Sequence, residues 1–140
     1  MKRLLLYTEM AVGLCILVTS QAVRAGEGDQ MDRLLDAIAK VESRNDPAAV
    51  GDTGRAAGMY QIHRSYWADA TRILGVDWEY RDARDPRKAR QAVRAYLRHY
   101  GSGRTLLDMA RIHNGGPRGH EKAATLTYVR RIEQVLNGAV

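Results

Sequence analysis

The sequence predicts an α+β domain, mainly α, with about five helices and a small β-hairpin region after the first helix. Apolar residues recur at helical spacing in several separate segments. Residues 48–62 lose this period and contain Gly51, Gly54 and Gly58, a pattern typical of tight turns between short strands. The 140 residues are 45% hydrophobic and 27% charged, without an internal repeat, which indicates one globular domain.

The N-terminus has the composition of a secretory signal peptide. Lys2 and Arg3 precede a mostly apolar run, and small residues before Ala25 form an A-x-A-like cleavage site. Thr8 and Glu9 interrupt the apolar run, so it is too short for a retained membrane anchor. We therefore predict a signal peptide over residues 1–25, a domain over residues 26–140, and export to the periplasm or the cell exterior, with membrane contact only during export.

Charge and cysteine content narrow the possible partners. Removing residues 1–25 takes away three basic residues and one acidic residue, so the formal net charge falls from +6 to +4. This modest positive charge suits an anionic polymer such as a cell wall. Nucleic acid is not expected, because no basic stripe rich in aromatic residues is present. The only cysteine, Cys15, leaves with the signal peptide, and the four histidines show no metal-ligand spacing, so no disulfide, metal or cofactor is predicted.

Capping residues place the five expected helices. Asp29 begins the first, and Asn45-Asp46-Pro47 ends it after about Arg44. The other four are expected over Ser65–Leu74, from Pro86 with Asp85 as cap to about Gly101, from Thr105 to a break at Asn114-Gly115-Gly116-Pro117, and over about Lys122–Asn137 with Gly138 beyond the end.

Glu42 continues the apolar face of the first helix. The face consists of Met31, Leu34, Leu35 and Ile38, and the next position of this stripe is Glu42. A carboxyl group in a partly dry interior has a raised pKa, which is the property that a general acid needs near neutral pH. The alternative is that the helix has frayed by this point and Glu42 faces water.

A second acid follows on the glycine-rich turn. Asp52, between Gly51 and Thr53, would lie in a polar environment. Glycoside hydrolysis uses two carboxyl groups in unlike environments, one that protonates the leaving oxygen and one that stabilises or attacks the sugar cation. The spacing alone is common, and Asp52 also suits ordinary turn hydrogen bonding. Asp46 is a competing second acid, but beside Pro47 it fits the turn that ends the helix.

These residues resemble a known signature. The segment ESRNDPAAVGDTGRAAGMYQIH is similar to that of the lysozyme-like superfamily, including lytic transglycosylases of the SLT type. The following QIHRSYWADA, ARIHNGGPRG and a T-x-YV segment resemble, in that order, the invertebrate-type lysozyme or destabilase branch. The resemblance runs from about Leu34 to Val135.

The resemblance implies a lysozyme-like fold and a peptidoglycan-cleaving glycosidase, a muramidase. Such an enzyme cuts the β-1,4 bond between N-acetylmuramic acid and N-acetylglucosamine in the glycan strands. Glu42 matches the general acid and Asp52 the second carboxylate. The residues that match the sugar cleft are Tyr60, Gln61, His63, Tyr66, His113 and Asn114.

Several alternatives remain open at this point. Invertebrate-type lysozymes are rich in disulfides and have a Trp where this chain has Val129, and both differences leave the subfamily open. His113 shares a face with Leu106, Met109 and Ala110, so it also suits a hydrogen-bonded core residue. A lytic transglycosylase would use Glu42 alone, and a non-catalytic wall-binding accessory protein of a secretion or conjugation system would need neither acid.

Overall fold

The computed structural model describes residue 26 and residues 28–138. The chain divides into two compact units, Met1–Asp32 and Arg33–Val140. In the first unit, the described residues 26 and 28–32 are helical. The predicted signal peptide lies outside the described residues. Within the described ranges, none of the helices has the length and apolar character needed to cross a membrane.

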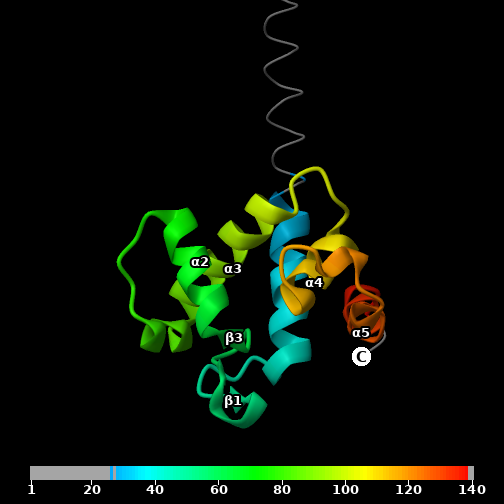
Figure 1. Cartoon of the computed structure of the whole chain (residues 1–140). Coiled ribbons are helices and arrows are strands. Elements are labelled where there is room, and N and C mark those ends of the chain that lie inside the picture. Colours follow the sequence, from blue (N-terminus) through cyan, green and yellow to red (C-terminus); the bar gives the residue numbers. More distant parts are fainter. Residues whose placement is uncertain (1–25, 27, 139–140) are drawn as a thin grey trace, which may run out of the picture. The chain divides into compact units, whose positions relative to one another are not determined.

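The second unit is mainly helical and carries one small antiparallel sheet (Figure 1), which confirms the predicted fold class. A helix spans residues 28–43, and its part from residue 33 belongs to this unit. The other α-helices are α2 (Arg64–Leu74), α3 (Pro86–Tyr100), α4 (Leu106–Gly115) and α5 (Leu126–Leu136). The sheet has the order β1 (Val50–Gly51), β2 (Ala56–Ala57) and β3 (Ile62–His63). Short 3-10 helices are η1 (Asp52–Gly54), η2 (Tyr80–Arg84), η3 (Gly119–Glu121) and η4 (Ala123–Thr125).

The helix that ends at residue 43 is the centre of this unit. Figure 1 shows it between the α2–α3 pair and the α4–α5 pair. Leu34, Leu35 and Ile38 have no exposed surface. The helix ends because Arg44 and Asn45 adopt left-handed φ angles of 58° and 67°. The predicted stop at Asn45 is thus confirmed within one residue, and Glu42 occupies the last helical turn.

The sheet is fastened to the end of this helix. The Ser43 hydroxyl donates to the Met59 carbonyl at 2.9 Å and accepts from the Asp46 amide at 3.0 Å. The Gly58 amide donates to the Ala49 carbonyl at 2.9 Å. These bonds hold the turn that carries Asp52 beside the helix that carries Glu42.

The predicted caps of the third and fourth helices are confirmed. The Asp85 carboxylate accepts from the Arg87 and Lys88 amides at 2.9 and 3.0 Å. The Thr105 hydroxyl accepts from the Asp108 amide at 3.1 Å. Side-chain caps satisfy amides that have no partner inside the helix, so both starting points could be identified from residue type.

The predicted start of the last helix at Lys122 is wrong, because α5 begins at Leu126 after η3 and η4. Thr125 explains the difference. Its hydroxyl is buried, lies 2.9 Å from the Gly119 carbonyl, and accepts from Arg111 Nε at 2.9 Å. The bonds of the Thr125 hydroxyl with the Gly119 backbone and the Arg111 side chain keep residues 119–125 in tight turns. Beyond the other end, Gly138 has a φ of 71°, as expected for a helix-ending glycine.

Gly58 provides a test of how the sheet packs against η2. A methyl group at Gly58 would lie 2.3 Å from the Ala83 carbonyl oxygen, whereas one at Gly54 would meet nothing within 4 Å. Both glycines have positive φ, so Gly54→Ala controls for backbone strain. We expect Gly58→Ala to lower the free energy of unfolding by about 1–3 kcal/mol more than Gly54→Ala, as measured by urea denaturation. Equal losses would show that this close packing is not required.

Candidate active site

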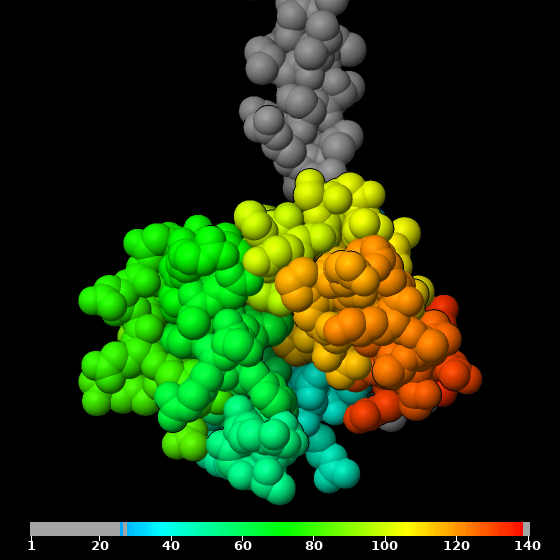
Figure 2. Space-filling view, in the orientation of Figure 1, coloured from blue at the N-terminus to red at the C-terminus, as the bar shows by residue number. Residues whose placement is uncertain are grey.

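One cleft of about 1020 Å³ contains nearly all the predicted site residues. Figure 2 shows the face on which α2, in green, and the segment after α4, in orange, border a recess. The sheet and the end of the first helix also contribute to the lining. Seven of the eight predicted residues line the cleft, namely Glu42, Asp52, Gln61, His63, Tyr66, His113 and Asn114.

Glu42 lies at the C-terminal end of the apolar helix face, and most of its side chain is buried. Its side chain is 19% exposed. Burial raises the pKa of the Glu42 carboxyl, and this effect exceeds the opposing influence of the Tyr128 hydroxyl and the Arg131 charge. Since the helix continues through residue 43, the frayed-helix alternative does not apply. The environment of Glu42 therefore favours the protonated form of its carboxyl group more than water does.

His113 is a buried neutral residue beside Glu42. Its Nε2 lies 3.2 Å from the Tyr60 carbonyl and 3.6 Å from Glu42 Oε1, and its Nδ1 lies 3.2 Å from the Tyr66 hydroxyl. Burial lowers the pKa of His113 to about 4, although the Tyr60 carbonyl favours the charged form. Because a carbonyl can only accept, we assign the proton to Nε2, and the Tyr66 hydroxyl then donates to Nδ1. The structure thus supports the interpretation of His113 as a hydrogen-bonded core residue, which also forms part of the cleft wall.

Tyr66 and Tyr60 have different surroundings. Tyr66 lines the cleft, stacks on Tyr96 with ring centroids 3.7 Å apart, and has a pKa raised well above its usual value, chiefly by burial. Tyr60 is fully buried and is not part of the cleft lining. Its hydroxyl accepts from Arg90 at 3.2 Å, and its carbonyl holds His113. The expectation that the Tyr60 side chain lines the sugar cleft is therefore corrected. It packs in the core behind His113.

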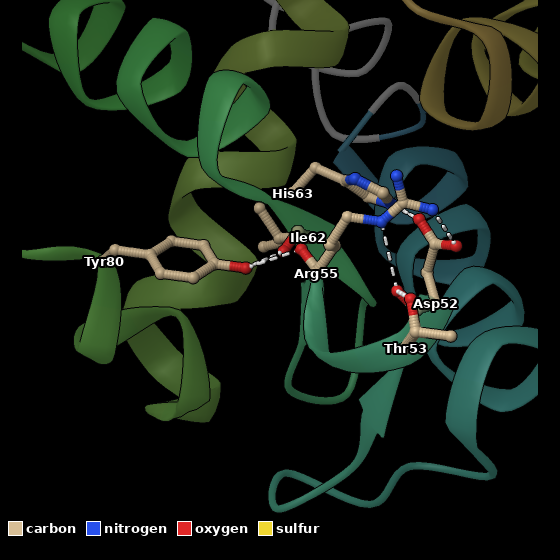
Figure 3. Close-up of polar contacts among 6 residues, drawn as sticks. All are labelled: Asp52, Thr53, Arg55, Ile62, His63 and Tyr80. Carbon is tan, nitrogen blue, oxygen red and sulfur yellow. Dashed lines mark hydrogen bonds and ion pairs between the residues drawn. The ribbon is translucent and has the colours of Figure 1, made fainter.

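Asp52 is exposed to solvent and lies beside basic side chains. Its side chain is 41% exposed, at the start of the η1 turn. Figure 3 shows two basic side chains against its carboxylate. An Arg55 guanidinium nitrogen lies 2.8 Å from Oδ1, and His63 Nε2 lies 3.5 Å from Oδ2. Each carboxylate oxygen therefore has its own basic neighbour.

Tyr80 supports both of these neighbours through the backbone. Its hydroxyl lies 2.7 Å from the Ile62 carbonyl and 3.0 Å from the Arg55 carbonyl (Figure 3). Residue 62 directly precedes His63 in β3, and Ala56, next to Arg55, pairs with His63 across the sheet. Tyr80 therefore fixes the two short chain segments that bring Arg55 and His63 to Asp52.

The cleft also contains polar residues that were not predicted to bind substrate, among them Asp69 and Arg72. Burial favours the neutral form of Asp69, but hydrogen bonds from Tyr100 and Arg72 outweigh it and lower the pKa of this carboxyl. Asp69 is the acid of the Tyr-Trp-x-Asp segment, so the sequence held a signal for it. Arg72, one turn further along α2, had no such signal.

The cleft thus combines a desolvated carboxyl group with an exposed carboxylate that contacts basic side chains. This combination suits proton donation to a leaving group and stabilisation of a developing positive charge. Within residues 26 and 28–138, no group of three His, Cys, Asp or Glu side chains lies close enough together to hold a metal ion.

Comparison with known proteins identifies the family. The Destabilase family matches residues 31–135. This chain belongs to the destabilase family. It is 33% identical over 109 residues to a lysozyme of Meretrix lusoria, covering 74% of this chain and 88% of that protein. The solved structure of the inhibitor-bound Meretrix lusoria lysozyme superposes with a TM-score of 0.64 at 31% identity, over 74% of this chain and 88% of that one.

A lysozyme of Ostrea edulis gives a shorter match. It is 44% identical over 77 residues, which cover 52% of this chain and 55% of that protein. The match thus spans about half the length of this relative. The order of the sequence motifs predicts this family, and the family match over residues 31–135 confirms the prediction.

The burial of His113 makes the stability of the folded state depend on pH. Unfolded histidine binds a proton near its ordinary pKa of about 6.5, whereas folded His113 does so only near pH 4. Between these values the unfolded state binds more protons, so the His113 contribution to stability is complete above pH 6.5 and is lost as the pH falls towards 4. The loss is on the order of 3 kcal/mol.

We expect His113→Gln to lose less stability than the wild type between pH 6.5 and pH 4, as measured by denaturant unfolding at a series of pH values. The exposed His99 provides a matched control, since His99→Gln removes a histidine that lies outside the core. The raised pKa of Glu42 changes stability with pH in the opposite direction. The measurement therefore compares the pH dependence of each variant with that of the wild type, and does not interpret the wild-type curve alone. Parallel curves for His113→Gln and the wild type would contradict the assignment of a buried neutral histidine.

Proposed function

We propose that this destabilase-family chain is an exported muramidase that hydrolyses the β-1,4 bond between N-acetylmuramic acid and N-acetylglucosamine. The observation that carries the proposal is the presence, in one cleft, of a desolvated Glu42 and an exposed Asp52. Two carboxyl groups in unlike environments suit the acid and charge-stabilising roles of glycoside hydrolysis. The family relatives named as lysozymes support the same activity.

Glu42 is the proposed general acid. Burial raises the pKa of this carboxyl and so favours its protonated form, which can donate to the departing glycosidic oxygen. The carboxylate left behind lies near the Tyr128 hydroxyl and the Arg131 charge, both of which favour its ionised form. His113 is neutral near pH 7 and uses its own proton at the Tyr60 carbonyl, so it does not compete for the Glu42 proton.

Asp52 is the proposed second carboxylate, which stabilises or traps the sugar cation. Arg55 holds Oδ1 at 2.8 Å, whereas His63 is further from Oδ2, at 3.5 Å. Oδ2 is therefore the oxygen with more freedom to face the sugar. Arg55 and His63 act as positioning residues in this proposal.

Substrate and location follow from the cleft and the N-terminus. The proposed substrate is the glycan strand of peptidoglycan, and Gln61, His63, Tyr66 and Asn114 supply polar groups along the cleft. Export to the periplasm or the exterior rests on the signal-peptide pattern of residues 1–25. The basic net charge favours approach to an anionic wall.

Product analysis on purified peptidoglycan tests the reaction. Mass spectrometry should find muropeptides with reducing ends that have gained water. Anhydro ends would instead identify a lytic transglycosylase, in which Glu42 acts alone. Asp52 on the cleft wall favours hydrolysis.

Glu42→Gln should lower the rate of bond cleavage by about 10²–10⁴-fold or more, since the amide cannot donate the proton. Burial disfavours the charge of Glu42, and the uncharged amide does not carry this cost, so this variant should also be more stable than the wild type at pH 7. Lost cleavage in a protein of unchanged or greater stability excludes misfolding as the cause. Unchanged biological function in this variant would instead support a wall-binding accessory protein.

Asp52→Asn and Arg55→Gln separate the chemical role from the positioning role. Asp52→Asn should cost several orders of magnitude in kcat, whereas Arg55→Gln should cost about 10-fold, because it removes the contacts of Arg55 with Asp52 but leaves the carboxylate in place. Steady-state kinetics on a soluble peptidoglycan fragment gives both values. Near wild-type kcat in Asp52→Asn would contradict a chemical role for Asp52.

A further inference from the structure

A second hollow lies on the other face of the small sheet. Ala56 lines the cleft, and the next residue, Ala57, lines this second cavity of about 380 Å³. Successive residues of a strand face opposite sides, so the sheet separates the two spaces. We call the second cavity the arginine groove. Its lining residues are Gly54, Ala57, Arg64, Glu79, Tyr80, Arg81 and Arg84.

The arginine groove has an excess of positive charge. Glu79 is its only acid and pairs with Arg81 at 3.1 Å. Among the described residues, no carboxylate lies within 4 Å of the guanidinium groups of Arg64 and Arg84. The positive charge of each group lowers the pKa of the Tyr80 hydroxyl, against the larger effect of burial. Two guanidinium groups are thus available to an anion.

The floor of the groove is held in place by the fold. The Arg64 guanidinium lies over the Tyr80 ring, 4.3 Å from its centroid. The Tyr80 hydroxyl is fixed at the Ile62 carbonyl at 2.7 Å, so the ring is a rigid platform. Gly58 packs directly against the Ala83 carbonyl, which joins the sheet to η2. A guanidinium that stacks on a fixed ring loses less conformational freedom when it binds an anion.

We infer that the arginine groove binds a phosphate group carried by a linear polymer. Guanidinium groups donate paired hydrogen bonds to oxyanions. The oxygens of a phosphate point in tetrahedral directions, so they can accept from two guanidinium groups at once. A planar carboxylate is already matched by one guanidinium group, so a site with two such groups suits a phosphate better. A hollow between the sheet and η2 accommodates one group on a chain better than a flat membrane surface.

This site would retain the protein on a phosphate-bearing envelope polymer while the separate cleft holds its own substrate. The inference depends on Arg64, Arg84 and Tyr80, and not on Glu42 or Asp52. It can therefore fail or succeed independently of the proposed muramidase activity.

The test compares variants of equal charge in the full chain. Arg64→Gln/Arg84→Gln removes the two available groups of the groove. Arg98→Gln/Arg104→Gln removes two exposed arginines at and beyond the far end of α3, for the same change in net charge. Arg64→Lys/Arg84→Lys keeps the charge but removes the planar fork. Binding of short-chain polyphosphate is measured by calorimetry at fixed ionic strength, with polyglutamate and phosphatidylglycerol vesicles as the other probes.

We expect the Gln variant of the groove to lose about tenfold or more in polyphosphate affinity and the control variant about threefold or less. The Lys variant should fall between them, and polyglutamate should bind more weakly than polyphosphate. Cleavage of a small soluble glycan should be the same in all variants, which shows that the fold is intact. Equal losses in the groove and control variants, equal binding of polyglutamate, binding to vesicles but not to polyphosphate, or no binding by the wild type would each overturn the inference.

Discussion

The withdrawal of Glu42 from water is the constraint on which the rest of the site depends. Leu34, Leu35 and Ile38 direct one face of the first helix into the core, and Glu42 continues that face. The left-handed Arg44 and Asn45 then end the helix, so that the carboxyl group lies at the cleft and not deeper in the interior. A carboxyl group in this place costs stability at neutral pH and gains the raised pKa that proton donation requires.

His113 preserves this environment because its own proton is used in another hydrogen bond. His113 is neutral near pH 7, donates to the Tyr60 carbonyl and accepts from Tyr66. A charged histidine 3.6 Å from the Glu42 carboxyl would favour its ionised form and oppose its proposed role as an acid. The burial that lowers the pKa of His113 and the burial that raises the pKa of Glu42 therefore act together.

Local signals in the sequence predicted the parts of the fold and of the site that depend on one helix or one turn. The period of the apolar residues identified Glu42, and Asp85 and Thr105 identified helix starts. The contacts of Asp52 with Arg55 and His63 could not be predicted, because they depend on the register that pairs Ala56 with His63.

Long-range contacts also explain the expectations that required correction. Tyr60 belongs to a segment that matches the family cleft, but its ring packs in the core and only its carbonyl contributes to the site through His113. The start of α5 was displaced by bonds from Thr125 to Gly119 and Arg111, and Arg111 belongs to another helix. A helical period carries no information about such partners.

No cysteine follows residue 25, so residues 26–140 contain no disulfide and depend on packing alone. Invertebrate-type lysozymes, which this chain resembles, are rich in disulfides, whereas here close backbone contacts join separate segments. Gly58 lies against the Ala83 carbonyl, and a methyl group at Gly119 would lie 2.0 Å from the Arg111 carbonyl. Each contact joins two separate segments, as a disulfide does, but it acts in the folded state and does not restrict the unfolded chain. Packing that only glycine permits therefore joins the turn after β2 to η2, and η3 to α4.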